Sequence, residues 1–133
     1  MSKENVEVAK RAMTAFGQRD LDSYEELFTP DFEWLPALPT TIESEGYHGR
    51  AGVERYFAEI SETWEAYRVT PEEYRDVGDS VLMVGRFETR GKASGVAVDS
   101  PLAVVFEFHD GRCSRSSAFF HSEQALKAVG LEE

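Results

Sequence analysis

The sequence predicts an α+β domain in which N-terminal helices pack on one side of a sheet formed by the second half of the chain. Three observations support this prediction. Apolar residues follow helical spacing in the first half, and they alternate at a period near two from Tyr67 onward. Turn sequences at Gly78-Asp79, Gly91–Gly95 and Asp110-Gly111 divide this second part into four strands. Short loops between consecutive strands favour antiparallel pairing.

Two helices and a short strand are expected first. Helical spacing begins the chain, with apolar positions at Val6, Ala9, Met13 and Phe16. Gly17 is suited to end this helix, and Asp20 to cap a second, shorter helix that ends at Pro30. Alternation over Asp31–Leu35 then predicts a strand, because polar residues alternate there with large apolar ones.

A loop over Ala37–Tyr47 leads into the most strongly amphipathic helix of the chain, which follows Gly49. Its large apolar face consists of Val53, Tyr56, Phe57, Ile60 and Trp64. At the other end of the chain, Ser122–Val129 is predicted to be a short helix, with Ser122 as its cap and Gly130 as its stop.

Alternation assigns the strand residues to two faces of the sheet. Pro71 places the first long strand at an edge, because a central proline would interrupt the hydrogen-bond ladder. One face meets the third helix and carries Val81, Met83, Gly85, Phe87, Leu102, Val104, Phe106 and Phe108. The other face carries Leu82, Val84, Arg86, Glu88, Ala103, Val105, Glu107 and His109, a mixture that suits solvent or a subunit interface.

Length and composition limit the classes of function. A chain of 133 residues, 41% of them hydrophobic, predicts one globular domain spanning residues 1–133. Fourteen basic and 25 acidic residues give a net charge of −11, which disfavours nucleic-acid and membrane partners. Cys113 is the sole cysteine, and no signal segment is recognised, so a cytoplasmic location is predicted. We interpret Cys113 as a buried apolar residue rather than a nucleophile.

Several short motifs, which together span nearly the whole chain, resemble the SnoaL-like family of the nuclear transport factor 2 (NTF2-like) superfamily. They are Glu4-Asn5-Val6, Phe16…Asp20-Leu21, Pro30-Asp31-Phe32-Glu33-Trp34, Tyr47-His48-Gly49-Arg50…Gly52-Val53, Asp110-Gly111-Arg112 and Ala125-Leu126-Lys127-Ala128-Val129-Gly130-Leu131. The resemblance implies a cone-shaped α+β fold of a bacterial type, in which a curved antiparallel sheet wraps around three N-terminal helices and a short C-terminal helix follows. It also implies a small-molecule cavity and a homodimer.

The resemblance includes enzymes whose catalytic positions are mostly not matched. At the positions that correspond to the acid–base groups of ketosteroid isomerase the chain has Ala12, Pro36 and Val104, none of which moves a proton. Isomerase chemistry of that type is therefore excluded. The triad of limonene epoxide hydrolase has no match either, since alternation directs Arg86 away from the pocket.

Polyketide cyclases of the family place a general-base aspartate just before the last helix, where this chain has His121. An imidazole can perform the same proton transfer near neutral pH, which makes His121 the candidate catalytic residue. Strict alternation with Ser116, Ala118 and Phe120 puts His121 on the opposite face unless the strand bulges. Both arrangements remain open.

The large aromatic residues are either a solid core or the lining of a cavity. The candidate ligand-binding residues are Trp34, Tyr47, Tyr56, Phe87 and Phe106, with Met83 as an adaptable filler. Such a lining suits a small flat, hydrophobic or aromatic ligand. His48 is expected at a helix end and His109 in solvent. The histidines and carboxylates lack the spacing of a metal site, so we predict neither a metal nor another cofactor.

Two hypotheses from different classes follow, and the sequence leaves open whether the protein is an enzyme. In the first, a cyclase-like or isomerase-like enzyme uses His121 for general acid–base chemistry. In the second, a non-catalytic ligand-binding or accessory protein uses the same cavity, or assembles through the sheet. A homodimer is predicted through the outer sheet face at Leu82, Val84, Ala103 and Val105. Cross-strand charge pairs are expected there among Arg86, Glu88, Glu107 and Arg115.

Overall fold

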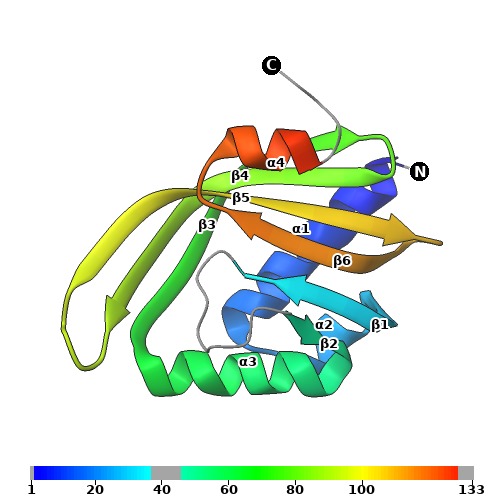
Figure 1. Ribbon diagram of the computed structural model, residues 1–133. Coiled ribbons are helices and arrows are strands. Elements are labelled where there is room, and N and C mark those ends of the chain that lie inside the picture. The colour runs from blue at the N-terminus through cyan, green and yellow to red at the C-terminus, as the bar shows by residue number, and fades with distance from the viewer. Residues whose placement is uncertain (1, 37–45, 129–133) are drawn as a thin grey trace.

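The computed structural model describes residues 2–36 and 46–128, and it confirms the predicted α+β class (Figure 1). Its helices are α1 (Ser2–Gln18), α2 (Leu21–Glu25), α3 (Gly49–Thr63) and α4 (Ser122–Ala128). Its strands are β1 (Phe28–Leu35), β2 (Tyr47–His48), β3 (Trp64–Val77), β4 (Ser80–Gly91), β5 (Ala97–His109) and β6 (Arg112–Phe119). Among the described residues, no helix has both the length and the apolar character to cross a membrane.

The strands form a six-stranded curved sheet in the order β2-β1-β6-β5-β4-β3. The four long strands β3 to β6 pair antiparallel in sequence order, as predicted, and β1 joins β6 in parallel. The edge position of β3 fits Pro71, where the register with β4 shifts between Pro71 and Glu73. The turn between β5 and β6 has positive φ at Asp110 and Gly111, as a two-residue hairpin turn requires.

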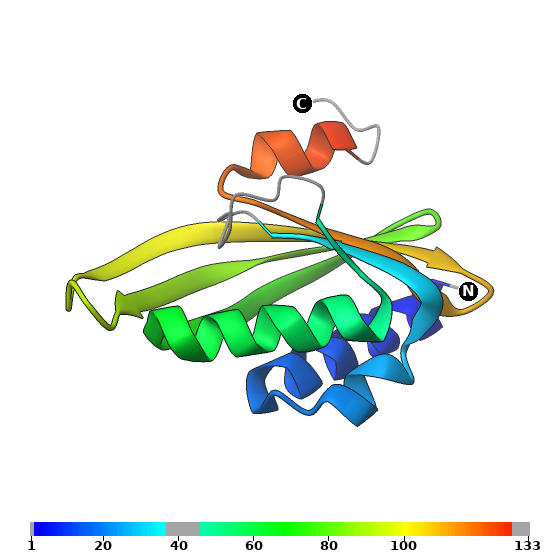
Figure 2. The ribbon, with the colours of Figure 1, turned by 60° about the horizontal axis from the view of Figure 1, so that its bottom comes forward.

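Helices cover both faces of the sheet. Figure 2 shows α1 and α3 below the sheet and α4 above it. The core lies between the sheet and α1, α2 and α3, and the inner residues assigned by alternation are in it, including Val81, Met83, Phe87, Leu102, Val104 and Phe106. We call this the inner face and the side under α4 the outer face.

The first helix ends two residues later than predicted. Gly17 lies within α1, and the chain turns at Arg19, which has a left-handed φ of 54°. The Asp20 amide donates to the Ala15 carbonyl at 2.9 Å, and the Arg19 amide to the Phe16 carbonyl at 3.0 Å. These two bonds form a Schellman motif with Arg19 at the position that glycine usually fills.

The prediction that the second helix runs to Pro30 is wrong. Helix α2 is capped by Asp20, whose side chain accepts from the Ser23 amide, but it ends at Glu25 and β1 begins at Phe28. Pro30 fits this strand because the pairing of β1 with β6 is irregular between Phe28 and Glu33. The short strand β2 was not predicted. Most of the predicted loop and the stop at Gly130 lie outside the described residues.

Helix α4 covers a large part of the outer face. Ala125 and Leu126 pack on Leu82, Ala103 and Val105, each of which is only 1% exposed. These three residues of the predicted dimer contact are therefore already buried within one chain. The outer charges do pair across strands: Arg86 with Asp99 at 2.6 Å, Arg68 with Glu88 at 4.0 Å and Arg115 with Glu107 at 3.9 Å.

Candidate functional site

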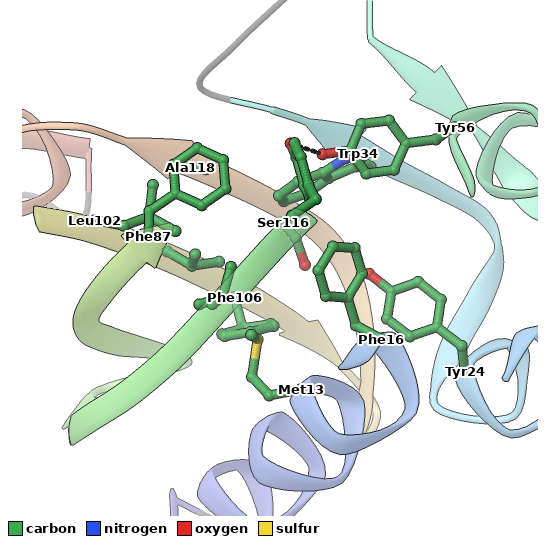
Figure 3. Close-up of a pocket in the computed structure, with 13 residues that line it drawn as sticks. Met13, Phe16, Tyr24, Trp34, Tyr56, Phe87, Leu102, Phe106, Ser116 and Ala118 are labelled. Atoms are coloured by element: carbon green, nitrogen blue, oxygen red, sulfur yellow. Dashed lines mark hydrogen bonds between the residues drawn. The ribbon is translucent and has the colours of Figure 1, made fainter. Parts of the chain in front are cut away.

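An apolar cavity lies between the inner face of the sheet and the helices (Figure 3). Its lining consists of Met13, Phe16, Tyr24, Trp34, Tyr56, Tyr67, Val69, Phe87, Leu102, Val104, Phe106, Ser116 and Ala118. The hollow measures about 490 Å³ including the part open to solvent, and the rings leave little free space between them. A bulky ligand therefore requires side chains to move.

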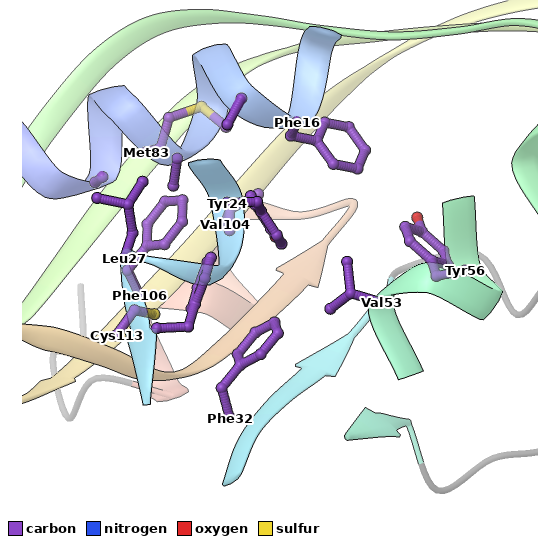
Figure 4. Close-up of a cluster of buried hydrophobic side chains, with 14 of the residues drawn as sticks. Phe16, Tyr24, Leu27, Phe32, Val53, Tyr56, Met83, Val104, Phe106 and Cys113 are labelled. Carbon is purple, nitrogen blue, oxygen red and sulfur yellow. The ribbon is translucent and has the colours of Figure 1, made fainter. Parts of the chain in front are cut away.

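Four of the six residues predicted to bind ligand line this cavity, namely Trp34, Tyr56, Phe87 and Phe106. They come from β1, α3, β4 and β5, which explains why their pattern is dispersed in the sequence. Met83 is fully buried and lies beside α1 within the core, outside the lining (Figure 4). Its strand alternation was predicted correctly, but the cavity does not extend to its position.

Tyr47 is buried behind the cavity wall rather than in it. Its ring centroid lies 5.0 Å from that of Tyr56, and its hydroxyl donates to the Glu59 carboxylate. Arg55 stacks over the Tyr47 ring at 4.9 Å and is 3.8 Å from Glu59. Tyr47 therefore supports Tyr56 from outside the lining.

Two tyrosine hydroxyls meet in the cavity wall. Tyr56 on α3 and Tyr67 on β3 share a hydrogen bond between their hydroxyl groups (Figure 3). Burial raises the pKa of Tyr67 to about 12, although the bond to Tyr56 and the charge of Arg19 oppose the rise. Burial and then Tyr67 raise the pKa of Tyr56 well above its ordinary value. Both groups are thus protonated hydroxyls at neutral pH.

The indole of Trp34 lies next to this pair, with its ring centroid 5.6 Å from that of Tyr56. Its Nε1 atom is buried beside the Tyr56 hydroxyl (Figure 3). This nearby N–H group lowers the pKa of Tyr56 and so opposes part of the increase that burial causes. It does not reach hydrogen-bonding geometry, so this N–H has no acceptor. A buried donor in this condition costs free energy of about 1–3 kcal/mol.

Arg19 places a positive charge behind the tyrosine pair. Its guanidinium is half-buried and donates to the backbone carbonyls of Phe16 at 2.5 Å and Tyr67 at 2.9 Å. Its pKa is lowered by burial and raised by the nearby Tyr56 and Tyr67. It also stacks over the Phe16 ring, 4.6 Å from the centroid. Among the described residues, no carboxylate pairs with it.

The thiol of Cys113 is buried, as predicted, and lies outside the cavity lining. Its Sγ contacts the Arg115 carbonyl at 3.2 Å and the Ser116 Oγ at 3.3 Å. Burial raises the pKa of Cys113 to about 12, so the group is a thiol rather than a nucleophilic thiolate at neutral pH. The hydroxyl of Ser116, which lines the cavity, is directed to this sulfur.

The candidate catalytic residue His121 is exposed and does not line the cavity. It follows the end of β6, and its backbone carbonyl accepts from the amides of Gln124 and Ala125 at the start of α4. His48 is exposed at the N-cap of α3 without a side-chain capping bond, and His109 is exposed in its turn. None of the three imidazoles is therefore positioned over the cavity.

The lining described here has little capacity for acid–base chemistry. It includes no carboxylate, imidazole, amine or guanidinium group. Two positions that correspond to the acid–base groups of ketosteroid isomerase are Ala12, which is buried outside the lining, and Val104, which lies in it. Neither side chain can transfer a proton. Within the described residues, no three histidine, cysteine or acidic side chains gather as metal ligands. The arrangement suits binding of an apolar molecule.

Solved structures with the same architecture include proteins described as NTF2-like. One is an NTF2-like protein from Burkholderia pseudomallei, 18% identical over 95% of this chain and 97% of that one, with a TM-score of 0.78. Another is TerC, co-crystallised with polyporic acid, which is 21% identical over 96% of this chain and 98% of that one, with a TM-score of 0.77. A third, from Jannaschia, is described as a SnoaL-like polyketide cyclase. It is 21% identical over 99% of this chain and 95% of that one, with a TM-score of 0.75. At these identities the likeness establishes the fold.

The SnoaL-like domain family matches residues 9–116, and the chain belongs to this family. The resemblance drawn from the sequence motifs is thereby confirmed. No curated protein matches the chain.

Sequence reasoning missed several important residues of the site. Tyr67 and Val69 alternate onto the inner face of β3, so strand periodicity was a usable signal for both. Tyr24, which lies on α2, was not assigned to the cavity. Arg19 gave no sequence signal, because its role depends on a helix end that was predicted at Gly17.

Proposed function

We propose that the protein binds a small apolar or aromatic molecule in the cavity, without catalysing its conversion. The observation that carries this proposal is the lining, more than half of which is aromatic and which has no group ionised at neutral pH. Ligand pockets are mainly apolar with a few placed polar groups, and the Tyr56–Tyr67 pair fits that description. The complex of TerC with polyporic acid supports small-molecule binding by this fold.

Thermal unfolding with a panel of one-ring and two-ring aromatic compounds tests the proposal. A compound that binds only the folded chain, present at 100 times its Kd, stabilises it by about 2.7 kcal/mol. For a domain of this size the melting temperature then rises by roughly 10 °C. Ala118→Leu fills the cavity and should abolish the rise. The matched substitution Ala58→Leu, at an exposed position of α3, should preserve it.

Equal stabilisation of both variants would place binding elsewhere. The absence of stabilisation by every compound in the unaltered chain would contradict the proposal.

A second candidate is a cyclase-like enzyme that uses His121, which the SnoaL-like family and the described polyketide cyclase from Jannaschia favour. It requires His121 to move from an exposed position into the cavity. Turnover of a polyketide-type carbonyl compound by the unaltered chain, lost in His121→Ala with the melting temperature unchanged, would support it over binding alone.

We also propose that the protein is a homodimer, formed through the part of the outer face that α4 leaves open. This part contains Val84 and the pairs Arg86–Asp99 and Arg68–Glu88. Both charge signs on one patch allow two copies to meet about a two-fold axis. Light scattering at micromolar concentration should give twice the mass of 15.0 kDa, and Val84→Asp should reduce it. A monomer in the unaltered chain would contradict this proposal.

A further inference from the structure

The cavity wall contains more hydrogen-bond donors than the protein satisfies. Tyr56 and Tyr67 have two hydroxyl protons between them and share one hydrogen bond. One hydroxyl proton therefore remains without an acceptor among the described residues. The Trp34 N–H, in the same wall, has no acceptor either. Buried donors are nearly always paired in folded proteins, so two unpaired ones in a cavity indicate that a ligand supplies the acceptor.

The charge near these donors has the matching sign. Arg19 lies behind Tyr67, with its guanidinium 6.0 Å from the Tyr67 ring centroid and bonded to the Tyr67 carbonyl. It has no carboxylate partner in the described part of the chain. A half-buried positive charge favours an electron-rich atom in front of the hydroxyl pair. It also disfavours a cationic ligand, although aromatic rings alone would attract one.

Across the lining from these donors, no strong acceptor competes with a ligand. Ser116 contacts Cys113, and Phe87, Leu102 and Val104 are apolar. The cavity thus has a polar end at Trp34 and the tyrosine pair, and the remainder is apolar except for the hydroxyls of Tyr24 and Ser116. This asymmetry favours one direction of entry for a ligand with a single acceptor.

We infer that the ligand is an aromatic or apolar molecule with an acceptor oxygen, a ketone or aldehyde carbonyl, held by the Trp34 Nε1–H and the free hydroxyl of the Tyr56–Tyr67 pair. The inference rests on the proposed function and narrows its ligand class. Its rings occupy the apolar end, between Phe87 and Phe106. Arg19 acts through Tyr67 as a positioning residue and does not touch the ligand.

A pair of probes that differ only in the acceptor tests this directly. Acetophenone has a carbonyl oxygen where the equally planar α-methylstyrene has a methylene group, and 2-acetylnaphthalene with 2-isopropenylnaphthalene gives the same comparison at two-ring size. We expect each ketone to bind about ten to one hundred times more tightly than its alkene, the ratio of about two hydrogen bonds. Calorimetry or nuclear magnetic resonance titration measures both affinities.

Proton nuclear magnetic resonance can detect the hydrogen bond itself. The chain has two tryptophans and therefore two indole N–H signals. Acetophenone should move the Trp34 indole proton downfield, and α-methylstyrene should not. The Trp64 indole is an internal control, because its Nε1 is also buried and unpaired but it does not line the cavity. Trp34→Phe assigns the two signals.

Matched variants separate the donors from the cavity as a whole. Trp34→Phe and the double substitution Tyr56→Phe with Tyr67→Phe, which removes both hydroxyl protons, should each weaken ketone binding about three- to tenfold while alkene binding changes less than about twofold. Tyr74→Phe, on the same strand β3 but outside the lining, should leave both affinities unchanged.

The possible outcomes distinguish the inference from the proposed function. Equal affinity for ketone and alkene would overturn the inference and leave apolar binding in place. Tighter binding of trimethylphenylammonium than of acetophenone would overturn it in favour of a cation site. Failure of both probe pairs to bind would contradict the proposed function and the inference together.

Discussion

Arg19 is the residue that most strongly connects the backbone of this protein to its cavity. A side chain in the left-handed region costs about 1–2 kcal/mol, which is why helices usually turn at glycine. Here the guanidinium donates to two backbone carbonyls, one at the end of α1 and one in β3. These bonds offset the backbone cost and fix the end of α1 against Tyr67.

Two substitutions separate the backbone and side-chain parts of this role. Arg19→Ala removes the guanidinium and keeps the left-handed strain, so we expect it to lower the free energy of unfolding by about 2 kcal/mol. Arg19→Gly also removes the strain and should be about 1 kcal/mol more stable than Arg19→Ala. Urea unfolding measures both. If the glycine variant is no more stable than the alanine variant, the turn at Arg19 is not strained.

The tyrosine pair predicts a loss of stability in alkali. The pKa of Tyr67 rises from 10.0 in the unfolded chain to about 12 in the folded one. Between these values the unfolded state has released a proton that the folded state retains, so the free energy of unfolding falls as pH increases. Tyr67 alone contributes about 3 kcal/mol over this range. Tyr56 and Cys113, whose pKa values are also raised, act in the same direction.

Urea unfolding at about pH 9 and about pH 11 measures this loss. Tyr67→Phe, which has no phenol proton at this position, should show a smaller fall between the two. A fall as large as that of the unaltered chain would show that Tyr67 is not protected in the folded state.

Single residues were predictable where strand or helix periodicity fixes their direction. Trp34, Tyr56, Phe87 and Phe106 were chosen as large rings on inward positions, and each lines the cavity. The depth of a residue along the cone is not encoded in that periodicity, because Met83 has the same alternation as Phe87 and lies outside the lining. The positions of large aromatic residues in the sequence therefore identify the inner face of the sheet, but they do not show which part of that face lines the cavity.

At the scale of elements, β3 and β4 lie close together at Gly85, opposite Pro71. A Cβ atom built on Gly85 would lie 2.2 Å from the Thr70 carbonyl oxygen. Because this oxygen belongs to the backbone, the strands themselves would have to move apart to relieve the overlap. The absence of a side chain there permits the irregular pairing near Pro71, where β3 bends beside the cavity residues Val69 and Tyr67.

Gly85→Ala should therefore be strongly destabilising, by about 3 kcal/mol, because the added methyl group overlaps backbone. Gly17→Ala is the matched control. Gly17 lies inside α1 and a Cβ there has nothing within 4 Å, so the change should stabilise the chain by about 0.5–1 kcal/mol. Thermal unfolding of the two variants measures the contrast. Similar melting temperatures would contradict the close approach of β3 and β4.

Elements with strong periodicity were predicted well, and those defined by pairing were not. Helix α3 has one broad apolar face and begins at Gly49 as expected, but it ends at Thr63. Trp64, which was assigned to the apolar face of this helix, is instead the first residue of β3. Strand β1 was shortened in the prediction because Pro30 was interpreted as a helix end, whereas irregular pairing with β6 accommodates it. The covering of the outer face was also missed. Ala125 and Leu126 are too few to show from sequence alone which surface they contact.

For the molecule as a whole, the sheet separates two environments. The inner face and α1, α2 and α3 enclose the cavity, and the outer face has α4 on it (Figure 2). His121 lies where the chain passes from the end of β6 to α4. The sequence resemblance predicted a catalytic role for this position. Whether its side chain faces the cavity depends on how the chain leaves the sheet after β6, and the alternation of residues along β6 does not determine that.

We therefore expect His121→Ala to change the affinity for an aromatic ketone by less than about twofold, since an exposed side chain outside the lining makes no contact with a ligand in the cavity. Stability should also change by less than about 0.5 kcal/mol, as for most exposed positions. Titration with acetophenone and thermal unfolding measure the two quantities, and Trp34→Phe is the variant that should weaken ketone binding in the same assay. A tenfold loss in His121→Ala would instead mean that His121 enters the cavity when ligand binds, and would restore the cyclase-like hypothesis.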